Sequence, residues 1–185
     1  MVTVGPVAGR NAAQSPATGP TVDGARAVAE TVTDPELPML TLHDLGVLRD
    51  VHLQDDGTLV VGITPTYSGC PAMAEMRADL TRALHAAGFA DVEVRTVLSP
   101  PWTTDDVTPR GRQVLAEHGI APPGPAPRRA PGPVPLTLGA RRPNVSCPQC
   151  GSRDTVETSR FGSTACKALY RCRSCAEPFE HVKAI

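Results

Sequence analysis

Five of the six cysteines of this 185-residue chain lie close together near its C-terminus. Four of them form two CxxC pairs, Cys147 with Cys150 and Cys172 with Cys175. Each pair can hold one side of a metal ion in a tight turn, and two pairs that meet across a hairpin supply the tetrahedral thiolate shell that Zn²⁺ prefers. The spacing therefore predicts a zinc ribbon over residues 144–185, with iron in the same four-sulfur shell as the alternative.

The predicted ribbon metal is structural, because a closed shell of four sulfurs leaves no open coordination position. A segment with few large apolar side chains needs the folding free energy that metal binding supplies. Phe161, Tyr170 and Phe179 are expected to form its small core. Cys166 lies between the two pairs and leaves three interpretations open: a substitute ribbon ligand, an inert buried thiol, or a thiol that faces a partner.

Composition divides the rest of the chain. With 20 prolines and 16 glycines, part of the length is expected to be linker. Residues 1–22 carry too little apolar surface to fold and are predicted to be disordered. Residues 23–120 have the patterning of one small domain, and the Pro-rich residues 121–143 are predicted to form a semi-rigid spacer between it and the ribbon.

The formal net charge of −1 gives the chain no overall field that would draw it to nucleic acid or to an anionic membrane. The C-terminal segment is basic, which leaves a nucleic-acid-binding ribbon as a remote alternative, although exposed stacking aromatics are not interleaved there. We see neither a secretory signal nor an apolar run of the roughly 18–20 residues that a membrane helix needs. A soluble, cytoplasmic protein is expected, and a reducing compartment favours metal binding over disulfides.

Periodicity predicts helices and strands in the region 23–120. A helix capped by Asp23 is expected to end by Thr33, and an acidic-Gly turn joins two antiparallel strands over 47–53 and 58–64. After Pro71 a helix is predicted up to Gly88, then a third strand near 91–98 and a short helix closed by Gly119. The apolar stripe of the helix after Pro71 consists of Met73, Met76, Leu80, Ala83, Leu84 and Ala87.

Cys70 is the one cysteine outside the ribbon, and it lies between a predicted strand and a predicted helix. The positive end of the helix dipole and free backbone N–H groups stabilise a thiolate there, which favours a reactive or metal-binding residue. The alternative is a small buried residue at a strand-to-helix junction. Asp34 and Glu36 in the DPELP segment are candidate ligands or bases, although an Asp before Pro commonly serves turn geometry.

The remaining residues that could take part in catalysis or ligand binding form no recognisable motif. Four histidines share no ligand spacing and are expected on the surface or in loops: His43, His52, His85 and His118. Trp102 fits either a partner surface or the core. The sequence contains no GxGxxG, P-loop, HExxH or GxSxG pattern, so the usual marks of a self-sufficient enzyme are missing.

Together these motifs resemble a known family. The DPELP segment, the element Thr64-Pro-Thr66-Tyr-Ser-Gly-Cys70-Pro and the PPWTTD segment are similar to the metal–sulfur cluster biosynthesis domain of cytosolic iron–sulfur assembly factors. With the added FGSTACKALYRC ribbon, the chain from about residue 23 onward resembles the PaaD (PaaJ) family, which belongs to bacterial phenylacetyl-CoA epoxidase systems. The resemblance implies an α+β domain with helices on one side of a small mixed sheet, tethered to a zinc ribbon.

The resemblance also implies a function in aerobic phenylacetate catabolism, as an accessory subunit that is not itself an enzyme. Its expected partners are the di-iron oxygenase and the iron–sulfur flavin reductase of the epoxidase, whose metal centre it would help to mature. By motif, Cys70 becomes the functional thiol that holds iron or a cluster transiently. Asp34 and Glu36 form the acidic loop beside it, and Thr64 and Thr66 the strand end that presents it. A structural subunit without metal chemistry is the alternative.

Overall fold

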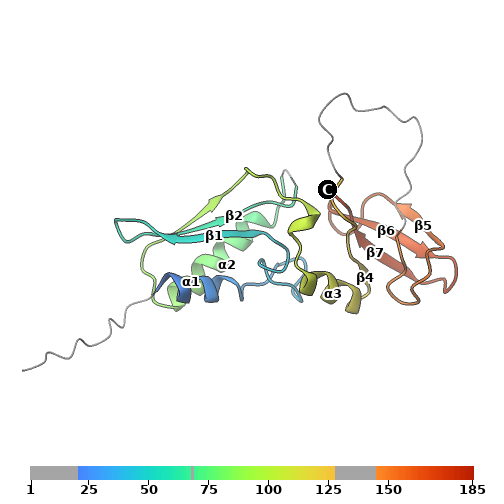
Figure 1. The fold of residues 1–185 in the computed structure, drawn as a ribbon, viewed down its shortest axis with the longest axis horizontal. Helices are drawn as coiled ribbons and strands as arrows, with labels where there is room; N and C mark the ends of the chain where they lie inside the picture. The colour runs from blue at the N-terminus through green and yellow to red at the C-terminus, as the bar shows by residue number, and fades with distance from the viewer. Residues whose placement is uncertain (1–20, 68, 128–144) are drawn as a thin grey trace, which may run out of the picture.

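The structure is a computed structural model that describes residues 21–67, 69–127 and 145–185 (Figure 1). Of the segment 1–22 predicted to be disordered, residues 1–20 lie outside the described residues, as do residues 128–143 of the predicted Pro-rich spacer. None of the helices in the described part of the chain has the length and apolar character needed to cross a membrane.

The N-terminal part of the described chain is built on a three-stranded sheet. Strands β1 (Leu48–Leu53) and β2 (Leu59–Ile63) are antiparallel, and β3 (Val92–Thr96) lies parallel to β2, in the order β1-β2-β3. Helices α1 (Val22–Ala29) and α2 (Met73–Ala86) lie on the same side of this sheet (Figure 1). The predicted α+β class with a small mixed sheet is confirmed.

Helix α2 follows the predicted stripe. Met76, Leu80 and Leu84 are buried against the sheet, and Gly88 ends the helix with the positive φ of 94° that glycine adopts most easily. All five residues of β2 are buried, as expected of a central strand.

Two local predictions are wrong. The cap of α1 is Thr21, whose side chain accepts a hydrogen bond from the Gly24 N–H at 3.1 Å, and not Asp23, which lies inside the first turn. Strand β1 does not alternate strictly, because the register shift between Leu48 and Asp50 allows Leu48 and Val51, three residues apart, both to be buried, and Leu53 at the hairpin end is 49% exposed.

The C-terminal part contains a 3-10 turn, η1 (Thr104–Asp106), helix α3 (Pro109–Glu117) and a four-stranded sheet in the order β4-β7-β6-β5. The strands are β4 (Ile120–Ala121), β5 (Thr155–Ser159), β6 (Lys167–Cys172) and β7 (Pro178–Val182). Strand β4 directly follows α3, yet it pairs with β7 in parallel. The ribbon sheet therefore includes a strand from the segment that leaves the α+β domain.

Further contacts join the ribbon to the α+β domain. Val182 and Ile120 are buried in the same apolar cluster as the residues of α1, α2 and β2. The carbonyl of Ile185 accepts hydrogen bonds from the Thr104 N–H at 3.2 Å and from its hydroxyl at 3.4 Å. The ribbon also has a separate apolar cluster of its own, which includes Tyr170 and Phe179, so it joins the main core only in part, through Val182 and the neighbouring Ile120.

The aromatic residues divide between core and surface. Trp102 is 6% exposed and donates its indole N–H to the Leu45 carbonyl at 2.8 Å, so it belongs to the core. Tyr170 and Phe179 are buried in the ribbon with ring centroids 5.8 Å apart. The prediction for Phe161 is wrong: its ring is 66% exposed and lies under the Lys183 ammonium.

Candidate functional site

The four cysteines of the two CxxC pairs gather at one end of the ribbon. Their sulfurs all lie within 4.8 Å of one another, with 3.7 Å between Cys147 and Cys175 and 3.6 Å between Cys150 and Cys172. Four thiolates at the usual Zn–S bond length form a tetrahedron with edges of about 3.8 Å. The four side chains therefore fit one tetrahedral metal ion with little rearrangement.

The backbone around these cysteines also favours metal binding. The N–H of Cys175 points at the sulfur of Cys172 at 3.5 Å, and this N–H lowers the pKa of Cys172 to about 6. Gly151 and Ala176 both have positive φ, 72° and 65°, directly after each knuckle. Ala176 adopts a conformation that is uncommon for a residue with a Cβ, as expected where metal binding fixes the turn.

Asp34, the first acidic residue of the predicted loop, is almost fully buried. Its Oδ1 accepts hydrogen bonds from the N–H groups of Glu36 and Leu37, both at 2.8 Å. Burial raises the pKa of Asp34, although these two N–H groups and the nearby Lys167 charge oppose the increase. Asp34 thus shapes the turn that presents Glu36, which is partly exposed.

Cys70 lies in the loop between β2 and α2, partly buried against the main apolar cluster. Its N–H donates to the Tyr67 carbonyl at 3.3 Å, and its own carbonyl accepts from the Met73 N–H at 3.4 Å. Thr64 is buried at the end of β2 and donates its N–H to the Val47 carbonyl at 2.9 Å. This bond fixes the start of the segment that leads to Cys70.

The thiol of Cys70 is not predisposed to ionise, contrary to the expectation from its position before a helix. Burial raises its pKa most, and the negative charges of Glu36 and Asp34 raise it further. The Ala72 N–H at the start of α2 lowers the pKa, as the sequence suggests, but less than burial raises it. At neutral pH Cys70 therefore carries its proton and gives it up only to a ligand that binds sulfur strongly.

The other predicted site residues differ in their surroundings. Thr66 is partly buried in the loop that precedes Cys70, two residues beyond the strand end that Thr64 fixes. Glu36 influences the Cys70 thiol directly, since its charge raises that pKa. The charges of Asp34 and Glu36 therefore both disfavour ionisation of Cys70, which lies in the loop where β2 leads into α2.

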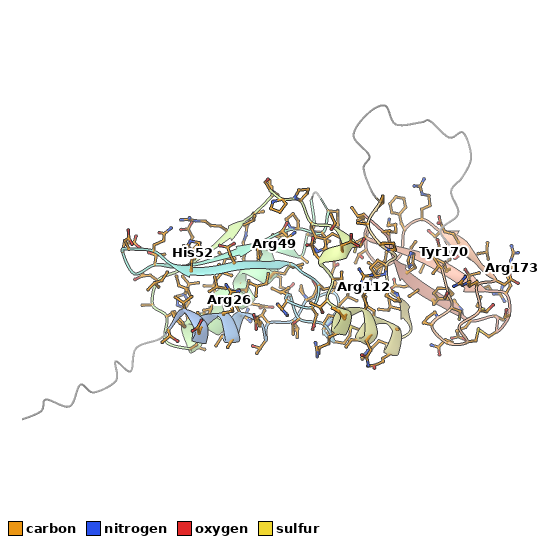
Figure 2. The ribbon with its side chains drawn as sticks, in the orientation of Figure 1. Arg26, Arg49, His52, Arg112, Tyr170 and Arg173 are labelled. Atoms are coloured by element: carbon orange, nitrogen blue, oxygen red, sulfur yellow. The ribbon has the colours of Figure 1, made fainter. Side chains whose placement is uncertain are left out.

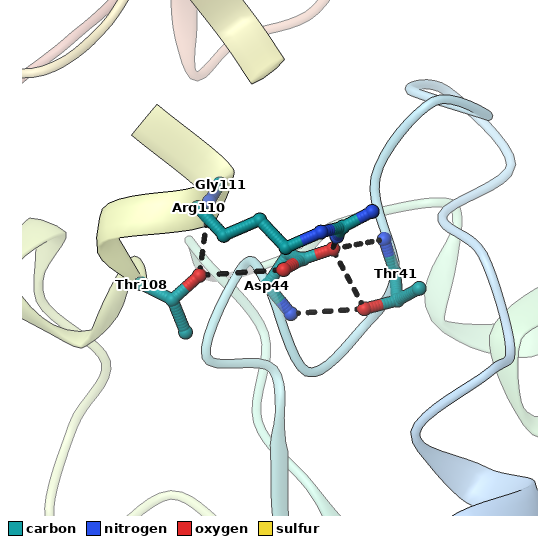
Figure 3. Close-up of polar contacts among 5 residues, drawn as sticks. All are labelled: Thr41, Asp44, Thr108, Arg110 and Gly111. Atoms are coloured by element: carbon teal, nitrogen blue, oxygen red, sulfur yellow. Dashed lines mark hydrogen bonds and ion pairs between the residues drawn. The ribbon is translucent and has the colours of Figure 1, made fainter. Parts of the chain in front are cut away.

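A network that the sequence did not single out holds the loop after the DPELP turn against α3 (Figure 3). The Asp44 carboxylate accepts hydrogen bonds from the N–H and hydroxyl of Thr41, from the Thr108 hydroxyl and from the Arg110 guanidinium. The Thr108 hydroxyl in turn caps α3 by accepting from the Gly111 N–H at 2.9 Å. In the sequence, only the TPRG segment indicates this contact between the Asp44 loop and α3, because a Thr before Pro is a typical helix cap.

Arginines support the junction between the sheets (Figure 2). Arg112 on α3 donates to the carbonyls of Thr104 and Pro123, which lie on either side of that helix in sequence. Arg49 on β1 donates both terminal nitrogens to Asp106 at 3.2 Å. His181, for which the sequence offers no signal, is buried in the ribbon with its Nδ1 3.2 Å from the Ala121 carbonyl.

Comparison with known proteins decides the family. The chain is 46% identical over 159 residues to a protein of Escherichia coli K12 that is named as a component of a "Putative 1,2-phenylacetyl-CoA epoxidase", covering 86% of this chain and 90% of that protein. The chain belongs to the PaaD family. The PaaD zinc beta ribbon domain matches residues 131–183, and the iron-sulfur cluster assembly protein family matches residues 25–96.

More distant relatives of this PaaD family member match about half of the chain. The "Fe-S protein maturation auxiliary factor YitW" of Bacillus subtilis is 35% identical over 80 residues, which is 43% of this chain and 78% of that protein. A crystal structure of a domain of unknown function, DUF59, from Bacillus anthracis is 27% identical and covers 51% of this chain and 90% of that one, with a TM-score of 0.47. The sequence relatives support an accessory role in an epoxidase or in iron–sulfur assembly.

Proposed function

We propose that this protein is a non-catalytic maturation factor of a phenylacetyl-CoA epoxidase in aerobic phenylacetate catabolism, and that it delivers iron or an iron–sulfur cluster to the oxygenase or the reductase component. The observation that carries the proposal is the partly exposed Cys70 thiol beside Asp34 and Glu36, on a domain whose relatives are named as Fe-S maturation factors. We place its action in the cytoplasm.

The two groups of cysteines suit different tasks. The four ribbon thiols form a closed shell, which fits a resident Zn²⁺ that stabilises the fold. A delivery site must also release its cargo, and one thiol in a loop can do so more readily than four that enclose a metal. We therefore assign the cargo to Cys70 and the zinc to Cys147, Cys150, Cys172 and Cys175.

The raised pKa of Cys70 fits reversible loading. When iron binds, the S–H bond breaks, an iron–sulfur bond forms, and the proton leaves to solvent. The reverse exchange returns a proton to sulfur as the iron passes to the client. Because protonated thiol is the stable form at neutral pH, proton return favours release of the cargo.

The experiment is to produce the oxygenase and reductase components together with the wild-type protein, the Cys70→Ser variant, or neither. After anaerobic purification, iron and acid-labile sulfide are measured in each component. We expect one component to lose most of its metal both when the protein is absent and when Cys70 is serine, while the variant keeps its zinc. The component that loses metal is the client.

A matched control is the Ser163→Cys variant, which adds a thiol on the exposed ribbon loop and leaves Cys70 in place. It should support full metal loading. If metal content is unchanged without the protein while activity or complex assembly falls, the protein is a structural subunit and the maturation proposal is wrong.

A further inference from the structure

The loop that connects β3 to η1 carries an exposed apolar surface. Leu98 is 69% exposed, the highest value among the large apolar side chains of the described residues. The three residues after it, Ser99, Pro100 and Pro101, are exposed as well. Trp102, which follows directly, is buried in the core, so the PPWTTD segment has its two prolines on the surface and its tryptophan inside.

This loop, residues 98–101, is fixed at both ends. The Val97 N–H donates to the Ile63 carbonyl at 2.8 Å, which extends the pairing of β2 with β3 up to the residue before Leu98. At the other end the Trp102 indole N–H donates to the Leu45 carbonyl at 2.8 Å. Two prolines further restrict the backbone between these points. The exposed leucine is therefore held in place in advance, and a partner that binds it does not have to order a flexible loop.

The same edge of the sheet leads to Cys70. Strands β2 and β3 are parallel and Ile63 pairs with Thr96, so both strands end at this edge. From here β2 continues into the loop that carries Cys70, and β3 continues into the Leu98 loop. The Arg77 guanidinium on α2 donates to the Thr96 hydroxyl, which ties the N-terminal half of that helix to the end of β3. Both loops thus belong to one end of the α+β domain.

A positive charge lies beside the Leu98 loop. Arg77 is exposed, and within the described part of the chain it forms no ion pair with a carboxylate. Arg95 differs, because Glu93 pairs with it at 2.6 Å. An arginine is common in protein interfaces, where its guanidinium can bind a carboxylate of the partner. The charge and the exposed leucine together fit a partner surface with an apolar pocket and an acidic residue at its rim.

We infer that the Leu98 loop and Arg77 form the docking surface for the client protein, whose apolar pocket receives Leu98 and whose carboxylate pairs with Arg77. The inference rests on the proposed function for the identity of this partner. A client bound here meets the end of the domain that carries Cys70, as delivery from that thiol requires. A small surface of this kind suits a complex that must separate again after delivery.

The surface is tested by binding. The oxygenase and reductase components are each produced without this protein, purified and immobilised, and the dissociation constant of the full-length, zinc-loaded protein is measured by biolayer interferometry. We expect Leu98→Asp to weaken binding to the client component at least about tenfold, because it places a negative charge against an acidic apolar pocket. The matched control is Leu53→Asp, which alters a 49% exposed leucine at the opposite edge of the same sheet and should bind as the wild type does.

The charge is tested separately with Arg77→Gln. Glutamine keeps a donor for the Thr96 hydroxyl but removes the positive charge. Its dissociation constant at low salt should be about three- to tenfold higher than that of the wild type, and it should depend less on ionic strength. Zinc content and thermal unfolding verify that each variant is folded.

The inference is supported if Leu98→Asp and Arg77→Gln both weaken binding while Leu53→Asp does not. It is overturned if the wild type binds neither component, if either variant binds as tightly as the wild type, or if Leu53→Asp weakens binding equally. It is also overturned if light scattering shows that Leu98→Asp only dissociates a dimer of this chain. Cys70→Ser should dock normally, so its metal-loading result decides the proposed maturation function independently of the docking surface.

Discussion

The charge of Glu36 adds to the effect of burial in raising the pKa of the Cys70 thiol. Burial raises the pKa of Cys70 most, and Glu36 is the first of the charged groups that raise it further. Replacing Glu36 with Gln removes that negative charge, so the pKa of Cys70 should fall and more thiolate should exist at pH 8. We expect iodoacetamide to alkylate Cys70 about two- to fivefold faster in Glu36→Gln than in the wild type, measured by peptide mass spectrometry on zinc-loaded protein.

The rate at which Cys70 is alkylated should increase with pH. In both proteins the alkylation rate should rise with pH, and in the wild type it should continue to rise beyond pH 9, the ordinary value for a thiol. The matched control is Asp55→Asn in the hairpin turn, which should leave the rate unchanged. Equal rates in Glu36→Gln and the wild type would show that the carboxylate does not act on the thiol.

Asp44 illustrates a residue whose ionised form the fold favours. Burial alone would raise its pKa, but hydrogen bonds from Arg110 and Thr41 outweigh burial and hold the pKa below its ordinary value. The stabilisation is therefore present above the unfolded-state pKa and is lost as pH falls through the folded-state pKa. We expect Asp44→Asn to lower the free energy of unfolding by about 1–3 kcal/mol at pH 7, measured by urea denaturation.

The stability difference between the wild type and Asp44→Asn should shrink as the pH falls below about 4, because the wild-type carboxylate becomes protonated. The comparison uses the difference between the two proteins, since release of zinc at low pH affects both. Asp55→Asn again serves as the control. A difference that stays constant with pH would rule out the ionised Asp44 as its source.

At the residue scale, the sequence could predict what depends on local spacing. The four ribbon ligands follow from two CxxC pairs, and the structure brings their sulfurs together. The surroundings of Cys166 could not be predicted, because its carbonyl accepts the N–H of Lys183, which the pairing of β6 with β7 brings beside it. The prediction for the ionisation of Cys70 is wrong for the same reason: the helix effect is local and visible, whereas burial and the acidic neighbours arise from tertiary packing.

At the scale of elements, α3 is positioned by a close approach of two backbones. A Cβ on Gly111 would lie 2.6 Å from the Asp44 carbonyl oxygen. Alanine normally stabilises a helix relative to glycine by roughly 1 kcal/mol, but here the side chain would push α3 away from the Asp44 loop. We expect Gly111→Ala to destabilise the protein by about 1–3 kcal/mol, measured by thermal or urea unfolding.

Gly124→Ala is the matched control, because a Cβ there would meet nothing within 4 Å. It should change stability by no more than about 0.5 kcal/mol. A Gly111→Ala variant as stable as the wild type would show that α3 can move away from the Asp44 loop without a loss of stability.

The elements themselves were largely predictable, and the exceptions have physical causes. Helix α2 follows its apolar stripe, and the hairpin of β1 and β2 follows its acidic-Gly turn. The register shift in β1 cannot be predicted from the alternation of apolar and polar residues along the strand. The two-residue β4 is too short for periodicity to reveal, and it forms only because β7 is there to pair with it.

At the scale of the whole molecule, the ribbon and the α+β domain should lose stability together when the metal is removed. Metal binding by the four thiols is expected to supply much of the folding free energy of the ribbon, yet β7 also pairs with β4 and Val182 fills part of the main core. Chelation of the ribbon metal should therefore raise amide hydrogen exchange in β5–β7, and also in β4 and in η1, whose Thr104 N–H donates to the Ile185 carbonyl.

Hydrogen exchange followed by mass spectrometry on the full chain resolves these segments. Re-addition of Zn²⁺ should restore protection both in the ribbon strands and in the segments outside the ribbon. Strand β2 and helix α2 are the internal reference and should change least, since β2 is the central strand of the other sheet and the buried face of α2 belongs to the same apolar cluster. If exchange increases only within β5–β7, the ribbon folds independently of the domain that carries Cys70.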